Sequence, residues 1–160
     1  NLILGMEDWP QFRRGPFQRQ RAIRAFAREL AGKYDVRCRS VEQAAGDLSG
    51  GNQQKVILAR EMDRAPKLLV VCQPTRGLDV GAIAYVRSQL LAQRRRGCAI
   101  LLISYELDEI MELSDRILTI YNGAITAEYA NGSVTREQIG LAMAGFRQGA
   151  AGGTGEEETE

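Results

Sequence analysis

Two kinds of apolar pattern alternate along the chain, one typical of strands and the other of helices. Residues 67–72 and 98–103 are continuous apolar runs of strand length. Such runs are typical of parallel strands that are buried on both faces. Residues 116–121 and 124–129 flank an Asn-Gly pair, which is the strongest short-range signal for a β-hairpin.

The other apolar residues recur at helical spacing or follow helix start signals. They predict five helices, over residues 17–33, 53–64, 80–96, 106–113 and 135–144. Two prolines and a glycine predict a loop over 10–16. Thr135 and Gln138 stand at the two positions of a capping box. Strand, helix, strand, helix and hairpin in this order predict an α/β fold with a parallel core.

Composition narrows the possible chemistry. The 160 residues are enough for one domain with a core, and the formal net charge of +1 favours neither nucleic acid nor an acidic substrate. Histidine is absent, so histidine-based triads, metal ligands and general bases are excluded. Three widely spaced cysteines have no metal-ligand spacing and indicate a reduced cytosolic setting. No apolar run approaches the roughly 20 residues of a membrane span.

One segment is clearly basic, although the whole chain is nearly neutral. Arginines are frequent over residues 13–39 and lie on several faces of the helix predicted for 17–33. We interpret them as a solvated face of an amphipathic helix, since Phe17 and Phe26 are expected to pack. The alternative is contact with anionic lipid or with a membrane partner.

A short glycine-rich stretch is the first candidate for chemistry: Leu48-Ser49-Gly50-Gly51-Asn52-Gln53-Gln54-Lys55. Glycines allow a close backbone approach, and a helix start presents free N–H groups and the positive end of its dipole. The arrangement suits a phosphate. The alternative is an ordinary capped helix, with Ser49 as the cap and the glycines as the turn.

The residues that follow decide between these readings. An apolar strand leads into Gln73-Pro74-Thr75-Arg76-Gly77-Leu78-Asp79-Val80-Gly81-Ala82, and a second apolar strand leads into Ser104 and Tyr105. This order and spacing resemble the C-terminal half of an ABC transporter nucleotide-binding domain, over roughly residues 1–144. The run from Gln73 is similar to the second domain of the duplicated ATP-binding subunits that drive sugar and nucleoside importers.

The resemblance implies a domain organisation. Residues 1–64 would be the helical subdomain that ends in the signature helix, and residues 65–147 the C-terminal half of the RecA-like core of a P-loop NTPase. Residues 148–160, rich in Gly and Glu, are expected to be a disordered tail. The resemblance also places the strand at 98–103 between the strand at 67–72 and a strand leading into the phosphate loop.

The family's phosphate loop, G-x-x-x-x-G-K-[ST], is absent from the chain. In the family this loop precedes the region that resembles residue 1 onward. We therefore expect the chain to be a piece of a longer subunit, with an incomplete ATPase fold and no ATP hydrolysis of its own.

Three catalytic positions of the family are also altered. Cys72 stands where an aspartate would bind Mg²⁺, and a thiol is a poor ligand for this hard cation. Gln73 stands at the position of the catalytic glutamate and cannot accept the proton of water. Tyr105 stands at the position of the switch histidine and has no proton acceptor near pH 7. The resemblance therefore implies no metal ligand here and a weak or inactive site.

The signature stretch, by contrast, is intact. In the family the dimer is head to tail, so a signature loop closes over nucleotide held by the partner domain. The resemblance implies that ATP, with Mg²⁺ in the complete subunit, is contacted by Leu48, Ser49, Gly50, Gly51, Asn52, Gln53 and Asp79. Asp79 is also a candidate N-cap for the helix that follows it.

The resemblance further implies the partners and the location. The partners would be the N-terminal nucleotide-binding domain of the same subunit, a membrane permease and, indirectly, a periplasmic or lipoprotein substrate-binding protein, with no nucleic acid. The chain would lie at the cytoplasmic face of the membrane. Two alternatives stay open: a regulatory or structural ABC-like module without activity, and an ABC ATPase outside transport.

Overall fold

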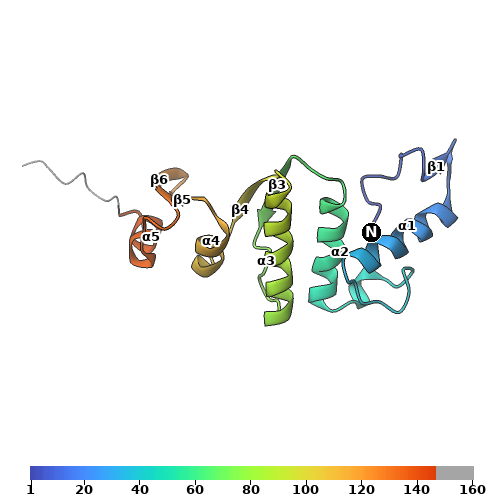
Figure 1. Cartoon of the computed structure of the whole chain (residues 1–160), viewed down its shortest axis with the longest axis horizontal. Helices are drawn as coiled ribbons and strands as arrows, with labels where there is room; N and C mark the ends of the chain where they lie inside the picture. The colour runs from blue at the N-terminus through green and yellow to red at the C-terminus, as the bar shows by residue number, and fades with distance from the viewer. Residues whose placement is uncertain (147–160) are drawn as a thin grey trace, which may run out of the picture. The chain divides into compact units, whose positions relative to one another are not determined.

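The structure, a computed structural model, describes residues 1–146, and the tail predicted for 148–160 lies outside the described residues. The chain divides into two compact units, Asn1–Tyr105 and Glu106–Glu160, which are described separately below (Figure 1). The predicted boundary between residues 64 and 65 stays a prediction. No helix in the described part is both long and apolar enough to cross a membrane.

The first unit begins with a helical part. A two-residue hairpin, β1 (Arg13–Arg14) and β2 (Phe17–Gln18), precedes α1 (Gln20–Lys33), so the helix predicted from residue 17 begins later and the loop predicted for 10–16 contains a strand. The cause is the Gly15-Pro16 turn, where Gly15 has a φ of +60° and folds the chain back on itself. A 3-10 turn, η1 (Ala45–Asp47), follows, and then α2 (Gly50–Met62), which packs on α1.

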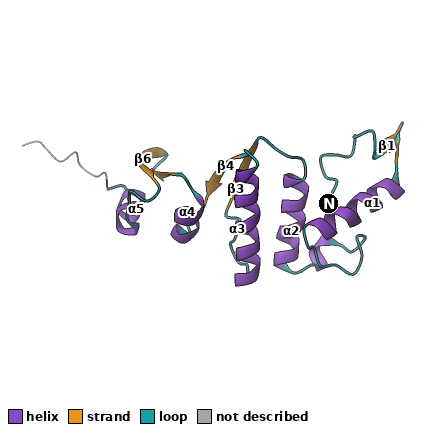
Figure 2. Ribbon diagram, viewed as in Figure 1, coloured by secondary structure: helices purple, strands orange, loops and turns teal. Residues whose placement is uncertain are grey.

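A parallel pair of strands completes the first unit (Figure 2). β3 (Leu68–Cys72) pairs with β4 (Ala99–Ile103) from Leu68 opposite Ala99 to Cys72 opposite Ile103, as the resemblance implied for these two strands. The crossover between them is α3 (Val80–Arg95), which contacts both α2 and β4.

The prediction that both strands are buried on both faces is wrong for the described residues. Alternate residues point to opposite faces of a sheet. One face holds Leu69, which is buried, with the half-buried Val71, Ile100 and Leu102. The other face is exposed and mostly apolar: Leu68, Val70, Cys72, Ala99, Leu101 and Ile103. An apolar run can reveal that a strand belongs in a core, but not which segment covers it.

The second unit is a hairpin between two helices, α4 (Leu107–Leu113) and α5 (Arg136–Met143). The predicted hairpin is confirmed: β5 (Arg116–Tyr121) pairs antiparallel with β6 (Ala124–Ala130). Asn122 and Gly123 have φ values of +48° and +77°, which the turn between two right-twisted strands favours. The capping box of Thr135 and Gln138 is also confirmed. Ile117, Val134 and Ile139 form the core of this unit.

Candidate functional site

The first candidate region is the start of α2. The helix was predicted to begin at Gln53 but begins at Gly50, so the two glycines form its first turn and Ser49 is the residue before it. Ser49 has an extended backbone, and its carbonyl accepts from the N–H of Gln53 at 2.9 Å. The side chain of Ser49 does not cap the helix. In the described residues, no hydrogen bond satisfies the first-turn N–H groups of Gly50, Gly51 and Asn52, and such groups suit an anion.

Two amide side chains fix the backbone before this helix. The Nε2 of Gln53 donates to the carbonyl of Leu48 at 2.9 Å. The N–H of Arg37 donates to Oδ1 of Asn52 at 2.8 Å, and Nδ2 of Asn52 donates to Oγ of Ser49 at 2.9 Å. Because Ser49 Oγ is the acceptor in that bond, its own hydroxyl hydrogen remains able to donate. Asn52 and Gln53 therefore position the turn, while the exposed Ser49 hydroxyl is the side-chain group that can face a ligand.

The start of α3 lies directly against the start of α2. A Cβ at Gly51 would lie 3.2 Å from the Cβ of Ala82 and 4.0 Å from Oδ2 of Asp79, and one at Gly50 would lie 3.9 Å from Leu78. The glycines therefore allow the two helix starts to approach closely. Asp79 Oδ1 accepts from the N–H of Ala82 at 2.8 Å, so the expected N-cap role of Asp79 is confirmed.

A half-buried cation, Lys55, connects α2 with its neighbours. Nζ of Lys55 donates to the carbonyl of Asp35 at 2.9 Å and to its Oδ2 at 2.6 Å, and lies 4.6 Å from the centre of the Tyr85 ring on α3. The hydroxyl of Tyr85 donates to the carbonyl of Tyr34 at 2.8 Å. These contacts hold α2 and α3 against the turn after α1.

The network has consequences for titration. The hydrogen bond from Lys55, and then its charge, hold the pKa of Asp35 below the ordinary value. Burial raises the pKa of Tyr85 to about 12, and the carboxylate of Asp35 adds to this effect. The sequence pattern did not single out this network, because Asp35 and Tyr85 lie 20 and 30 residues from Lys55 and no local spacing joins them.

The second candidate region is the carboxyl end of β3 and β4. Cys72 lies opposite Ile103, and the N–H of Gln73 donates to the Ile103 carbonyl at 2.8 Å. Parallel pairing therefore brings Cys72 and Gln73 next to the strand end that carries Tyr105. Tyr105 and Cys72 are exposed, although Cys72 ends the apolar run 67–72 that is typical of a buried strand.

This strand end does not fit a Mg²⁺ site. Mg²⁺ binds hard oxygen ligands, commonly carboxylates, and the positions at the end of β3 carry a thiol and a neutral amide. The described residues also contain no cluster of three His, Cys, Asp or Glu side chains that could hold a metal. Gln73 has a φ of +49°, which is uncommon for a residue with a Cβ, so the chain turns sharply after β3.

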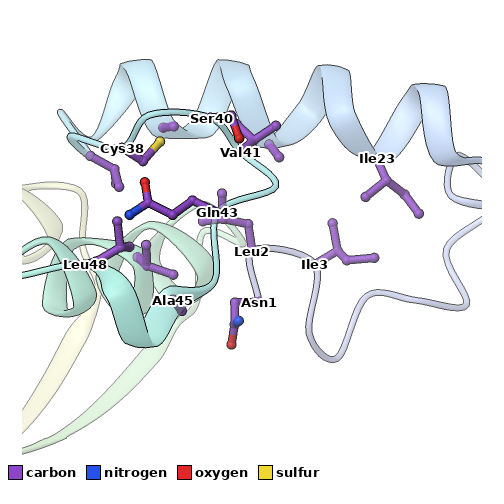
Figure 3. Close-up of a pocket in the computed structure, with 14 residues that line it drawn as sticks. Asn1, Leu2, Ile3, Ile23, Cys38, Ser40, Val41, Gln43, Ala45 and Leu48 are labelled. Carbon is purple, nitrogen blue, oxygen red and sulfur yellow. The ribbon is translucent and has the colours of Figure 1, made fainter.

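We call residues 48–52 the signature turn. A mainly apolar cavity of about 120 Å³ lies beside Leu48, its first residue. It is lined by the N-terminal segment, α1, the loop around Cys38 and Val41, and Leu48 (Figure 3). Leu48 lines this cavity, whereas Ser49 is exposed.

Sequence comparison found import ATP-binding proteins as relatives, and a search of family models found no match. A guanosine import ATP-binding protein of Bacillus subtilis is 53% identical over 126 residues, which are 79% of this chain and 25% of that protein. A nucleoside import ATP-binding protein of Lactococcus lactis is 47% identical over 145 residues, 91% of this chain and 29% of that protein. The chain thus spans about a quarter of the length of these relatives.

Solved structures give the same fold. A nucleotide-free ATP-binding cassette from an ABC transporter matches with a TM-score of 0.61 and 24% identity, over 88% of this chain and 51% of that one. A dimeric structure of a bacterial ABC transporter cassette matches with a TM-score of 0.60 and 21% identity, over 76% of this chain and 52% of that one. The predicted fold, part of a P-loop ATPase cassette, is confirmed.

Proposed function

The chain belongs to the ABC ATPase family, and from this membership we propose that it is the C-terminal part of the second nucleotide-binding domain of an importer's ATP-binding subunit. The cargo class would be simple sugars or nucleosides, in line with the named functions of the relatives. In this role the chain supplies the signature turn to a nucleotide that another domain holds, and its own strand-end site does not drive hydrolysis.

The observation that supports the proposal most directly is the set of free hydrogen-bond donors at the start of α2. Its first-turn N–H groups lack partners in the described residues, and Ser49 retains a hydroxyl hydrogen to donate. Asn52 and Gln53 hold the turn in place, and the start of α3 packs against it through Gly51. A preorganised set of donors aimed at one place is suited to stabilising the charge of a phosphate.

The strand-end residues support the second half of the proposal. Gln73 can hydrogen-bond a water molecule but cannot accept its proton, and loss of a positioned general base typically costs ~10²–10⁴-fold in rate. Tyr105 offers a hydroxyl where a proton acceptor would be needed. These residues would therefore contribute little to turnover, even with ATP and Mg²⁺ present in the complete subunit.

The partners and location follow from the same reading. The nucleotide would be held by the N-terminal nucleotide-binding domain of the same subunit, and the assembly would bind a membrane permease at the cytoplasmic face. A periplasmic or lipoprotein substrate-binding protein would deliver the cargo to that permease. A dimeric cassette among the similar structures supports the pairing of two domains.

The test compares two substitutions in a full-length subunit that contains this chain. Ser49→Arg places a bulky cation on the exposed face of the signature turn and should remove most steady-state ATP hydrolysis. Gln73→Ala should leave most of the activity intact. Ser88→Arg, at an exposed position on α3, is the control for adding the same side chain to the same unit. If Gln73→Ala were the more damaging change, the strand end would line the active site and the signature turn would serve the weak one, the reverse of this proposal.

A further inference from the structure

Several exposed arginines on the hairpin β1–β2 and on α1 have no acidic partner among residues 1–146. Residues 9–28 contain six arginines and no Asp or Glu. Arg13 pairs with Asp8, and Arg24 pairs with Glu42 at 2.6 Å. The other four are exposed, and no ion pair involves them in the described part of the chain: Arg14, Arg19, Arg21 and Arg28. We call these four arginines, together with Phe17, the basic surface.

Phe17 is held in solvent by the fold. Its side chain is 76% exposed, although its backbone is paired with Arg14 in the hairpin. The hairpin is anchored by Phe12, which is 1% exposed and packs on Phe26 of α1 with the ring centres 5.0 Å apart. The N–H of Arg19 also donates to the Phe12 carbonyl at 2.7 Å. The expectation that Phe17 packs is therefore wrong, and with it the reason for treating the arginines only as a solvated face.

The start of α1 adds to the same positive potential. Its first turn has no acidic residue, no side chain caps it, and Arg19 stands at the N-cap position. Positive side chains at a helix N-terminus oppose the helix dipole, so this arrangement does not favour the folded chain by itself. An external anion beside Arg19 and Arg21 would relieve the opposition.

We propose that the basic surface binds anionic phospholipid at a membrane surface, with the arginines on the headgroups and Phe17 inserted between them. Arginine-rich surfaces with an exposed aromatic side chain suit the interface of an anionic bilayer. A nucleic acid fits less well, because the whole chain has a net charge of only +1. This binding involves none of the nucleotide-site residues, so it stands or falls independently of the proposed function.

The chain contains one tryptophan, and its position makes it a probe of this contact. Trp9 is partly exposed and stacks on Phe12, the anchor of the hairpin, at 6.4 Å between ring centres. The experiment floats the chain, held soluble by the upstream half of a related subunit whose tryptophans are replaced by phenylalanine, with vesicles of phosphatidylcholine alone or mixed with phosphatidylglycerol, and records Trp9 emission. Flotation separates lipid-bound protein from aggregates, which sediment. We expect binding and a blue shift only with the anionic vesicles, and both should weaken as salt is added.

Matched variants locate the contact. Arg19→Gln with Arg21→Gln should weaken vesicle binding by about thirtyfold, because each arginine near an anionic surface raises the affinity roughly fivefold. Phe17→Ser should weaken binding and abolish the blue shift. Arg95→Gln with Arg96→Gln removes the same charge from the exposed end of α3 and should leave binding unchanged. Far-ultraviolet circular dichroism checks that each variant retains the helix content of the parent chain.

Three results would overturn the proposal. The first is equal flotation with neutral and anionic vesicles. The second is an equal loss of binding in the two double-arginine variants, which would reflect net charge rather than this surface. The third is tighter binding to a single-stranded oligonucleotide than to the anionic vesicles, which would reassign the basic surface to nucleic acid.

Discussion

The start of α2 and the carboxyl end of β3 and β4 are two candidate sites in the same unit. They differ in the contacts that hold them and in the chemical groups that they carry. At the α2 start, side chains from the loop and the helix hold the turn, and α3 packs against it through Gly51. At the strand end, the N–H of Gln73 donates to the Ile103 carbonyl and the Gln73 carbonyl accepts from the N–H of Arg76. The side chains there are a thiol, an amide and a phenol, none of which is a carboxylate or a general base at neutral pH.

In our proposal the strand end has lost its catalytic groups but keeps the backbone framework that positions them. The parallel pairing of β3 and β4 still brings Cys72 and Gln73 next to the end of β4. The signature turn, which in our proposal serves a nucleotide on another domain, retains the first-turn N–H groups and the Ser49 hydroxyl as donors. The two regions are therefore under different chemical demands although they lie in one compact unit.

The largest expected effect concerns whether β3 and β4 can fold without a covering segment. One of their faces exposes Leu68, Val70, Leu101 and Ile103. Covering each of these half-exposed side chains would add about 1 kcal/mol to the free energy of unfolding. The outer edge of β4 is also unpaired in the described residues. We expect the 160-residue chain alone to aggregate or fold only partly, and to become soluble when the upstream half of a related subunit, with its phosphate loop, is supplied in trans.

Size-exclusion chromatography and circular dichroism, with and without that upstream half, measure this directly. A sharp monomer peak with a cooperative melt from the chain alone would show that the exposed face needs no cover. In that case β3 and β4 would fold without a further segment, just as the starts of α2 and α3 do, and the two regions would not differ in this respect.

The next effect probes the contact between the two helix starts. Gly51→Ala places a methyl group 3.2 Å from the Cβ of Ala82, which is closer than normal packing allows. The signature turn should shift by a few tenths of an ångström, and ATPase activity of a full-length subunit should fall about tenfold, because small displacements of positioning groups are costly. Steady-state hydrolysis is the measurement.

Gly46→Ala is the matched control, because a Cβ at Gly46 meets no atom within 4 Å. It should retain the parent activity. Equal activity in both variants would mean that the close approach of α2 and α3 has no part in positioning the signature turn.

A smaller effect concerns the stability that the Lys55 network gives to this region. Tyr85→Phe removes the hydrogen bond to the Tyr34 carbonyl and should lower the free energy of unfolding by about 1 kcal/mol at neutral pH. The folded-state pKa of Tyr85 is raised to about 12 from 10.0. Its neutral form therefore stabilises the fold below pH 10, and this contribution is lost as the pH rises toward 12.

The difference between the parent and Tyr85→Phe should accordingly shrink as the pH rises from 10 to 12, because only the parent has a phenol to ionise. Urea denaturation of the soluble two-part complex at several pH values measures it. A gap that stays constant or widens over this range would show that burial of Tyr85 does not favour its neutral form.

The sequence was sufficient for features set by local chemistry. The Asn122-Gly123 turn, the Thr135 capping box and the Asp79 N-cap were all predicted and are all present. Each depends on residues within three or four positions of one another, so spacing alone specifies it.

Features set by packing between distant segments were missed or misjudged. The exposed face of β3 and β4 and the exposure of Phe17 depend on which segments cover them, and an apolar run does not contain that information. The Lys55 network joins residues up to 51 positions apart, from Tyr34 to Tyr85. The start of α2 was placed three residues late because the glycines were treated as a turn, whereas they form the first helical turn.

The smallest effect tests whether the strand end can be repaired. Cys72→Asp, Gln73→Glu and Tyr105→His together would restore a hard oxygen ligand, a general base and a proton acceptor at positions that β3 and β4 already bring to one edge. We expect less than a doubling of the ATPase rate of a full-length subunit, because the repaired site would still need a competent signature from the facing domain. The matched control carries Ser49→Arg in addition. If the signature turn of this chain serves the other site, the control isolates the turnover of the repaired site alone, and we expect that turnover to be small. A doubled rate in the triple variant, half of which survives Ser49→Arg, would reveal two sites of equal strength and remove the asymmetry between the signature turn and the strand end.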